Sequence, residues 1–403
     1  MTIRFNPVNP AAQSYPKLHL PVQPVFSFSA LKIIPNNGLQ PSAFIRQGIF
    51  LSNARTCLAH AFALSEINAE SAVLIPAYHC GSMVEPALWL DAEVLLYHLE
   101  PNLSPNQHHL EKLINNATKP IRAMLLPHYF GFPQNIDHWR AFCDTNNIKL
   151  IEDCAHSFFG TTTQGKILGT SGNYAVASVR KFFSSPDGGI LIGENLSPTS
   201  LPTIKPNFKS QLHAILQTLL LSAEFGRLGL PGQLILQLDK WRSKLKHHFL
   251  SAQTIPSKEE STTMQWNWFD PALMHIKGLA TSHILMKYSR TQDIIKIRRK
   301  NYAQLIEGIA ETQHLKPLFP ELPNHVVPYM LPVLLESGEA DFDRLKRAGI
   351  PLWRWEELAV SDCPVSQRYR LQLLQIPCHQ NLTSSEIDWI ISQLGKILGS
   401  RKI

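Results

Sequence analysis

The sequence predicts an α/β fold, with a mainly parallel, doubly wound sheet in a large domain and a small C-terminal α+β domain. Two observations predict it. Between about residues 50 and 195, short apolar runs alternate with stretches whose apolar residues recur at helical spacing, a pattern typical of parallel strands joined by helices. From Leu273 to Ile309 the chain shows a long helical pattern, and one apolar run and two helical stretches follow it.

The elements of the large domain are expected in strict alternation. Helical spacing occurs at 53–67, 83–92, 108–117 and 136–147, and strand-like apolar runs occur at 72–78, 93–99, 121–130, 148–156, 172–179 and 188–193. Ligands of such sheets collect at the carboxyl ends of the strands. The polar residues that close the apolar runs are therefore the candidates for a site: Tyr78, His79, His128, Tyr129, Asp153, His156, Ser178 and Lys181.

Three changes of composition divide the chain. Residues 1–48 are rich in proline and are expected to form an extended N-terminal arm. The large domain is expected over 49–290 and the small domain over 291–403. Residues 195–265 carry Ser, Pro and Lys at both ends and an apolar helical stretch between them, which indicates an insertion or an elaborated linker.

Composition limits the class of protein. The chain has 403 residues, of which 44% are hydrophobic and 17% charged, values typical of an ordinary globular protein. The net charge of +7 favours anionic partners, but the Lys and Arg residues are dispersed, so small phosphorylated molecules are as good an interpretation as nucleic acid. Six cysteines without a CxxC pair indicate reduced, buried thiols in a cytoplasmic protein.

Neither end of the sequence nor its interior predicts a membrane span. The N-terminal stretch lacks the apolar core of a signal peptide. The most apolar stretch, 214–238, is interrupted by Glu224, Arg227 and Pro231. This stretch is interpreted as helical core or a partner surface, with contact to a membrane surface as the alternative.

Asp153 and Lys181 carry the strongest chemical indication. Asp153 ends one apolar strand beside Glu152, and strand alternation places these two carboxylates on opposite faces. Lys181 follows the next strand in the pattern Ser178-x-x-Lys181. Alone, the first would be a turn carboxylate and the second a surface lysine. Together, at neighbouring strand ends, they are what a pyridoxal phosphate site requires, a lysine for the Schiff base and an aspartate for the pyridine nitrogen.

A third element, a phosphate anchor, is expected at a helix start. Polar residues precede the helix at 53–67, where free backbone N–H groups and the helix dipole favour an anion. Arg55 in the first turn would add a charge-assisted contact. The order of these three elements along the chain is the informative feature.

Several further stretches occur in an order that is typical of one enzyme family. They are NARTCL (53–58), IPAYHC (75–80), HYFGFPQNID (128–137), IEDCAHSFFG (151–160), GKILGTSGNYAVAS (165–178), QWNWFDPAL (265–273) and LQIPCHQNLT (374–383). In them the chain resembles the DegT/DnrJ/EryC1/StrS family of PLP-dependent sugar aminotransferases, of the fold-type-I aspartate aminotransferase superfamily. The resemblance is strong over about 45–195 and looser over 262–395.

The resemblance implies pyridoxal 5′-phosphate as cofactor and assigns catalytic roles. Lys181 would be the Schiff-base lysine and the general base of the proton shift. Asp153 would pair with the pyridinium nitrogen, and His156 would lie near the ring hydroxyl.

The resemblance also implies how the phosphate is held. Main-chain N–H groups of Ala54 and Arg55 and the hydroxyl of Ser178 would bind it. Asn267 matches an asparagine that reaches the phosphate from the partner subunit, which implies a homodimer with shared active sites.

A residue from Tyr78 to Cys80 should cover the other face of the cofactor ring. By register the family's stacking aromatic falls at Cys80, which is not aromatic. Tyr78 and His79 are both left as substitutes.

This sequence departs from the family pattern at several positions. Ala54 and Arg55 replace the glycine and threonine of the phosphate loop, and Lys181 follows Ser178 by three positions where most members have five. Phe269 replaces the arginine of an Asn-Tyr-Arg motif. The last departure and the insertion at 195–265 put the substrate in doubt.

The resemblance implies an aminotransferase that converts a keto sugar, nucleotide-linked in most of the family, to an amino sugar with a donor such as glutamate. One alternative is a ketone that is not nucleotide-linked, and another is a non-catalytic scaffold. A scaffold needs neither Asp153 nor Lys181, which argues against it.

The remaining polar residues give no clear indication of a catalytic or metal-binding role. His60, His98, His213, His247 and His248 lack metal-ligand partners at suitable spacing, so no metal site is expected. Arg354 and His379 match regions that line the substrate pocket in the family, with structural roles as the alternative.

Overall fold

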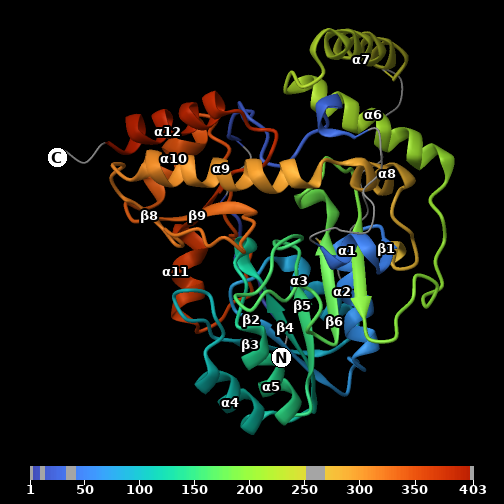
Figure 1. Cartoon of the computed structure of the whole chain (residues 1–403), viewed down its shortest axis with the longest axis vertical. Coiled ribbons are helices and arrows are strands. Elements are labelled where there is room, and N and C mark those ends of the chain that lie inside the picture. Colours follow the sequence, from blue (N-terminus) through green and yellow to red (C-terminus); the bar gives the residue numbers. More distant parts are fainter. Residues whose placement is uncertain (1–2, 10–13, 33–41, 251–267, 400–403) are drawn as a thin grey trace.

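The computed structural model describes residues 3–9, 14–32, 42–250 and 268–399. Its centre is a seven-stranded sheet in the order β1-β7-β6-β5-β4-β2-β3 (Figure 1). The pairs from β6 to β3 are all parallel, whereas β7 pairs antiparallel with both β6 and β1. The predicted mainly parallel α/β sheet is confirmed.

The elements of the sheet layer follow the predicted alternation. The strands are β1 (Ile49–Leu51), β2 (Ala72–Pro76), β3 (Glu93–Tyr97), β4 (Ile121–Pro127), β5 (Lys149–Asp153), β6 (Tyr174–Ser178) and β7 (Gly189–Gly193). The helices are α1 (Ala43–Arg46), α2 (Ala54–Leu64), α3 (Gly81–Trp89), α4 (Gln107–Asn116) and α5 (Ile136–Thr145), with short 3₁₀ turns η3 (Tyr129–Gly131) and η4 (Val179–Lys181).

Burial and capping explain why these elements form. Every residue of β2 is buried, as expected for a central strand covered on both faces. Helices α2, α4 and α5 each start at an asparagine whose side chain accepts a backbone N–H of the first turn: Asn53, Asn106 and Asn135. Strands β4 and β5 are shorter than the apolar runs predicted and end at Pro127 and Asp153.

A smaller antiparallel sheet lies beside the large one, in the order β10-β9-β8. Its strands are β8 (Leu315–Pro317), β9 (Met330–Leu335) and β10 (Leu373–Pro377), with helices α9 (Thr291–Ile309), α10 (Glu339–Arg347), α11 (Pro364–Gln372) and α12 (Ser384–Leu398). It has its own apolar cluster, to which α9 contributes Tyr302 and Leu305. The domain limits 49–290 and 291–403 remain predictions.

The long helix expected over 273–309 is instead two helices, α8 (Ala280–Tyr288) and α9, preceded by the turn η5 (Pro271–Leu273). Ser289 between them is extended. The N-terminal segment explains the break, because Lys32 donates to the carbonyl of Tyr288 and Arg290 donates to the carbonyl of Ala30. The prediction of one continuous helix was therefore wrong.

The arm and the insertion meet on the outside of the molecule. Near its start, the arm contacts the segment before α11, where Nδ2 of Asn6 donates to the carbonyl of Leu358. Farther along, it passes through η2 (Phe28–Ala30) and pairs through Leu31 with Ser289 after α8. The insertion forms α6 (Phe208–Glu224) and α7 (Gly229–Leu250), which lie at the periphery, away from the large sheet (Figure 1). The arm reaches them too, since Phe26 donates to the hydroxyl of Ser222.

Candidate active site

A cavity of about 450 Å³ lies at the carboxyl ends of β5 and β6, between the large sheet, the small sheet and the arm. Its lining combines a few charged groups with many aromatic and neutral ones: Val22, Gln23, Asn53, Ala54, Arg55, Leu58, Cys80, Ser82, Met83, Asp153, Ala155, His156, Val176, Ser178, Arg180, Lys181, Gly188, Trp268, Tyr329, Met330, Trp353, Trp355 and Gln375. Seven of the nine predicted site residues are among them.

Asp153 and Lys181 face this cavity together. Asp153 ends β5 and is 5% exposed, and its Oδ1 accepts the N–H of Ala155 at 2.8 Å. Burial raises the pKa of Asp153, while the charge of Lys181 acts in the opposite direction. Burial lowers the pKa of Lys181, opposed by Cys80 and Asp153 and reinforced by Arg180 and Arg55. A lowered pKa increases the neutral, nucleophilic fraction of the amine.

Glu152 points to the opposite side of β5, as strand alternation predicts. Its carboxylate is 1% exposed and accepts four hydrogen bonds, from Nε2 of His128 (3.0 Å) and from the backbone N–H groups of Gly169 (3.0 Å), Ser171 (2.7 Å) and Gly172 (2.6 Å). Burial raises the pKa of Glu152, but the bonds outweigh it and the pKa lies below its ordinary value. Glu152 fixes the strand that carries Asp153.

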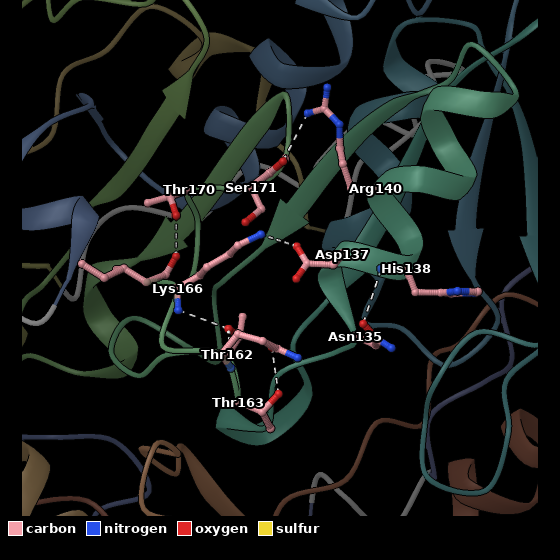
Figure 2. Close-up of polar contacts among 12 residues, drawn as sticks. Asn135, Asp137, His138, Arg140, Thr162, Thr163, Lys166, Thr170 and Ser171 are labelled. Atoms are coloured by element: carbon pink, nitrogen blue, oxygen red, sulfur yellow. Dashed lines mark hydrogen bonds and ion pairs between the residues drawn. The ribbon is translucent and has the colours of Figure 1, made fainter.

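The loop that supplies these amides is itself tied to α5 (Figure 2). Lys166 pairs with Asp137 at 2.5 Å, and Arg140 donates to the carbonyl of Ser171 at 3.2 Å. Within the loop, the hydroxyl of Thr162 accepts the N–H of Lys166. The contacts in Figure 2 therefore support the site from behind and lie outside the cavity.

The backbone of Lys181 is held by a buried arginine. Arg298 of α9 is 0% exposed and donates to the carbonyls of Lys181 (2.7 Å) and Tyr329 (3.0 Å). Its guanidinium also lies 4.4 Å from the ring centroid of Phe182. Burial lowers the pKa of Arg298 to about 10, so it remains charged at neutral pH. Nζ of Lys181 lies 5.4 Å from the ring centroid of Tyr329.

His156 stands in a stack of rings beside the lysine. It stacks on Tyr329, with centroids 4.4 Å apart and the ring planes 25° from parallel, and lies next to Phe130 and Trp355. Burial, and then the charge of Lys181, lower its pKa well below the ordinary value, so the imidazole is neutral. The N–H of Phe130 donates to Nδ1 at 3.3 Å, which leaves the ring proton on Nε2.

The start of α2 forms another wall, where Asn53, Ala54 and Arg55 line the cavity. Asn53 caps the helix by accepting the N–H of Thr56 at 3.0 Å. A Cβ on Gly189 would lie 2.2 Å from the carbonyl carbon of Asn53, so only glycine lets β7 approach this helix start. Gly189 thus permits the close packing of α2 on β7.

The candidates for ring stacking are separated by the structure. Cys80 lines the cavity, but Tyr78 and His79 do not. Tyr78 is fully buried behind the wall, 5.0 Å from the ring of Trp355. His79 donates from Nδ1 to the carbonyl of Pro76 and accepts the N–H of Ala359 at Nε2, and burial lowers its pKa to about 4. The predicted stacking role of Tyr78 is not supported by its position.

The segment that resembled the Asn-Tyr-Arg motif is only partly described. Asn267 lies outside the described residues. Trp268, which follows it, lines the cavity, and its carbonyl accepts a bond from Arg55 while its N–H donates to Glu85 at 2.8 Å. Phe269 is 3% exposed and packs on Trp89, away from the cavity.

Sequence reasoning missed the aromatic walls of the cavity. It singled out Arg354, but Arg354 forms bidentate bonds to Glu339 (2.9 and 2.7 Å) and another to Glu356 (2.7 Å) outside the cavity. Its neighbours Trp353 and Trp355 line the cavity instead. Alternation along an extended WRW segment was the signal that could have found them. His379, the other uncertain candidate, is buried and bonds the carbonyl of Pro21.

Arg180 is a further residue that the sequence did not single out. It precedes Lys181, is exposed and lines the cavity with Arg55. The described lining thus holds three cations, namely Arg55, Arg180 and Lys181, and one carboxylate, Asp153.

The residues present fit pyridoxal phosphate. Asp153 offers a buried carboxylate for a protonated ring nitrogen, Lys181 offers an amine with a lowered pKa, and the start of α2 offers backbone N–H groups. The excess of cations in the lining matches a phosphate dianion.

Two clusters of metal-ligating side chains occur in the described residues. His98, His109 and Asp362 lie together at the surface, but the two imidazoles are stacked face to face, with centroids 3.6 Å apart. Parallel rings point their in-plane lone pairs alongside each other, not at one shared ion. In the second cluster, His128 and Glu152 are already bonded to each other.

Comparison with known proteins agrees with the fit of this cavity to pyridoxal phosphate. Residues 43–197 match the model of the DegT/DnrJ/EryC1/StrS aminotransferase family. Similar solved structures include a DegT DnrJ EryC1 StrS aminotransferase from Brucella abortus, with TM-score 0.59, 17% identity and coverage of 87% of this chain and 86% of that one. A protein described as a sugar aminotransferase, Spr1654 from Streptococcus pneumoniae in its PLP form, gives TM-score 0.62, 13% identity and coverage of 94% and 98%.

A third similar structure is Helicobacter pylori PseC, an aminotransferase involved in the biosynthesis of pseudoaminic acid, with TM-score 0.57, 13% identity and coverage of 91% and 93%. At these identities the structures show the fold, which is the predicted fold-type-I fold of PLP-dependent aminotransferases. The family match covers the segment that carries Asp153 and Lys181. Over residues 43–197, the chain is similar to the DegT/DnrJ/EryC1/StrS aminotransferase family.

Proposed function

We propose that this chain is a PLP-dependent aminotransferase that converts a keto sugar to an amino sugar. The observation that carries the proposal is the meeting of Lys181 and Asp153 in one cavity beside the open start of α2. The family match and the PLP form of a similar structure support the cofactor.

Each part of the cavity would hold a different part of the cofactor. Lys181 would hold it covalently through Nζ, Asp153 would bind its protonated ring nitrogen, and Arg55 with the first N–H groups of α2 would bind its phosphate, helped by Ser178. Bound pyridoxal phosphate supplies an electron sink and a carrier for the amino group.

The protein's own groups then position reactants and move protons. Lys181, with a pKa lowered by burial, takes up a proton at Nζ and returns it as general base and acid. Neutral His156 would donate a hydrogen bond from Nε2 to the ring hydroxyl of the cofactor. Arg298 fixes the backbone of Lys181, and the aromatic walls of Tyr329 and Trp355 exclude water from the reacting groups.

The acceptor is proposed to be a keto sugar linked to a nucleotide, with glutamate as the amino donor. The family assignment and the similarity to sugar aminotransferases support the sugar. The net charge of +7 and the exposed Arg180 at the cavity are compatible with a diphosphate group.

One observation favours a second candidate, a ketone substrate without a nucleotide. Phe269 stands where the family carries an arginine, and it is buried against Trp89, so that position places no cation on the cavity. Much of the remaining lining is neutral or aromatic, including Gln23, Trp353 and Gln375. A neutral sugar ring would fit such walls.

A homodimer and a cytoplasmic location complete the proposal. The match of Asn267 to a residue that reaches the partner's phosphate supports the dimer. All six cysteines are free thiols and five of them are buried, which supports a reducing compartment.

Half-reaction assays test the function. Reconstituted wild-type protein is mixed with glutamate and other amino donors, then with nucleotide-linked keto sugars or free ketones, while the visible absorbance is followed. A donor should bleach the absorbance and the true acceptor should restore it. Restoration by free ketones alone selects the second candidate. An absorbance that no donor changes supports a non-catalytic scaffold. Lys181→Ala is the control and should respond to none.

A further inference from the structure

The outer side of α7 carries an apolar stripe that packs against nothing in the described structure. Leu230, Leu234, Leu238 and Trp241 are 76%, 62%, 66% and 68% exposed. Their spacing of four, four and three residues places them on one face of the helix. Large apolar side chains at such exposure are unfavourable in water, so a continuous row of them indicates a surface that is covered in use.

This stripe is not needed to attach α7 to the molecule. The inner side of the helix does that, through Ile235 and Leu236, which pack against a separate cluster containing Phe26, Ala223 and Leu285. The helix therefore has one apolar side that packs against the rest of the molecule, and a second apolar side that is exposed in the described structure. Figure 1 shows α7 at the outermost edge, with α6 between it and α8.

The charges of the insertion indicate what covers the stripe. Between residues 201 and 250 the sequence holds seven cationic residues, Lys205, Lys209, Arg227, Lys240, Arg242, Lys244 and Lys246, and two acidic residues, Glu224 and Asp239. Glu224 is paired with Lys17, and Arg227 with Glu386, so the excess comes from the remaining lysines and Arg242. Lys240 is exposed next to Trp241. An exposed apolar helix face next to a lysine, in a segment whose sequence is rich in cations and with a tryptophan among the apolar residues, is typical of a helix that lies in a membrane interface.

We propose that the outer face of α7 docks the enzyme on an anionic lipid surface. Leu230, Leu234, Leu238 and Trp241 enter the boundary between headgroups and acyl chains, and the exposed Lys240 meets the negative headgroups. The helix lies on the membrane and does not cross it, since no described helix is long and apolar enough to span one. A second copy of this chain would bury the apolar stripe but would bring like charges together, which disfavours it.

Flotation with vesicles tests the proposal on the full-length, PLP-loaded protein. Vesicles of phosphatidylcholine alone are compared with vesicles in which roughly a third of the lipid is phosphatidylglycerol. The protein should float with the anionic vesicles at low salt, bind them less at high salt, and remain largely unbound with phosphatidylcholine alone.

Three variants locate the contact. Leu234→Gln combined with Trp241→Gln should lower partitioning onto anionic vesicles by roughly tenfold or more. Lys240→Glu removes one attraction to the anionic headgroups and adds one repulsion from them. Each changes the partition coefficient about fivefold, so together they should lower partitioning by roughly 25-fold. Val360→Gln, at another exposed apolar residue on the segment before α11, should change nothing. Tryptophan emission should shift to the blue with anionic vesicles, and Trp241→Phe should remove much of that shift while flotation persists.

Two results overturn the proposal. The first is a wild-type protein that does not float with anionic vesicles. The second is binding that the double variant and Lys240→Glu leave unchanged. A lower molar mass of the double variant in light scattering, together with no vesicle binding by wild type, assigns the stripe to a second copy of the chain instead. Should the double variant fail to fold, the vesicle binding of Lys240→Glu alone tests the proposal, and binding equal to that of wild type overturns it.

Discussion

At the scale of single residues, burial acts in opposite directions on the two central groups. It raises the pKa of Asp153 and lowers that of Lys181, while their mutual attraction opposes both shifts. The result is a carboxylate that needs a cationic partner and an amine that is more readily neutral. This combination suits a site that holds a protonated ring nitrogen and uses an amine as nucleophile.

Arg298 is predicted to be a positioning residue. Arg298→Met leaves the carbonyls of Lys181, Pro328 and Tyr329 without their guanidinium donor, and should lower the free energy of unfolding by about 3 kcal/mol. Arg298 also holds the backbone of Lys181, the residue proposed to carry the cofactor. The variant should therefore shift the pH at which the cofactor's visible absorbance is half changed.

Arg299→Met is the matched control for that titration. Arg299 is the next residue of α9 and also donates to backbone carbonyls, those of Pro323 and Val326, but it does not contact Lys181. A pH midpoint that moves equally in both variants would contradict a positioning role for Arg298.

Sequence reasoning located the polar residues of the site better than its aromatic ones. Asp153, His156 and Lys181 could be predicted because each closes an apolar run and the chain order matches a known family. Alternation along their extended segment could have paired Trp353 with Trp355, but local pattern does not show which face of that segment meets the distant large sheet, so neither was placed in the site. Tyr78 was misplaced for the same reason, since the packing of Trp355 and Tyr369 decides its burial.

At the scale of elements, β5 and the loop behind it hold Asp153 through Glu152. Glu152→Gln keeps the shape of the side chain but removes the charge that accepts three backbone N–H groups and His128. The free energy of unfolding at neutral pH should fall by about 3 kcal/mol, as measured by urea denaturation.

The pH dependence of that effect has a defined sign. The pKa of Glu152 is lowered in the folded state, so its stabilising contribution is present above the carboxylate's unfolded pKa of about 4.3 and is lost as the pH falls through the folded value. The difference between wild type and Glu152→Gln should therefore shrink on acidification below about pH 4. A difference that stays constant over this range would show that charge is not its cause.

Gly81, the first residue of α3, is predicted to affect the binding of pyridoxal phosphate. A Cβ on Gly81 would lie 2.3 Å from the indole ring of Trp268, so Gly81→Ala should displace that ring from the cavity wall. The dissociation constant for pyridoxal phosphate, measured by absorbance titration, should rise several-fold. Trp268→Ala should have a similar effect and Trp268→Phe a smaller one. Trp389→Phe, in the small domain, is the control, and equal weakening by it would refute the role of Trp268.

At the scale of the whole molecule, the site depends on segments far apart in the sequence. The cavity takes Gln23 from the arm, Asp153 and Lys181 from the large sheet, and Gln375 from the small sheet. The arm also separates α8 from α9 and anchors α6. The alternating pattern predicted the large sheet because parallel strands and their helices are local in sequence. The break at Ser289 was not predicted, since it depends on pairing with a segment more than 250 residues away.

The central claim is that Lys181 is the residue that holds the cofactor, and covalent trapping tests it most directly. The reconstituted protein is reduced with borohydride and digested, and the peptides are identified by mass spectrometry. The account predicts a yellow protein that borohydride bleaches, with the cofactor's mass on the peptide containing Lys181, and a Lys181→Ala variant that remains colourless. A wild-type protein that stays colourless with pyridoxal phosphate, or a label on any other lysine, would contradict it.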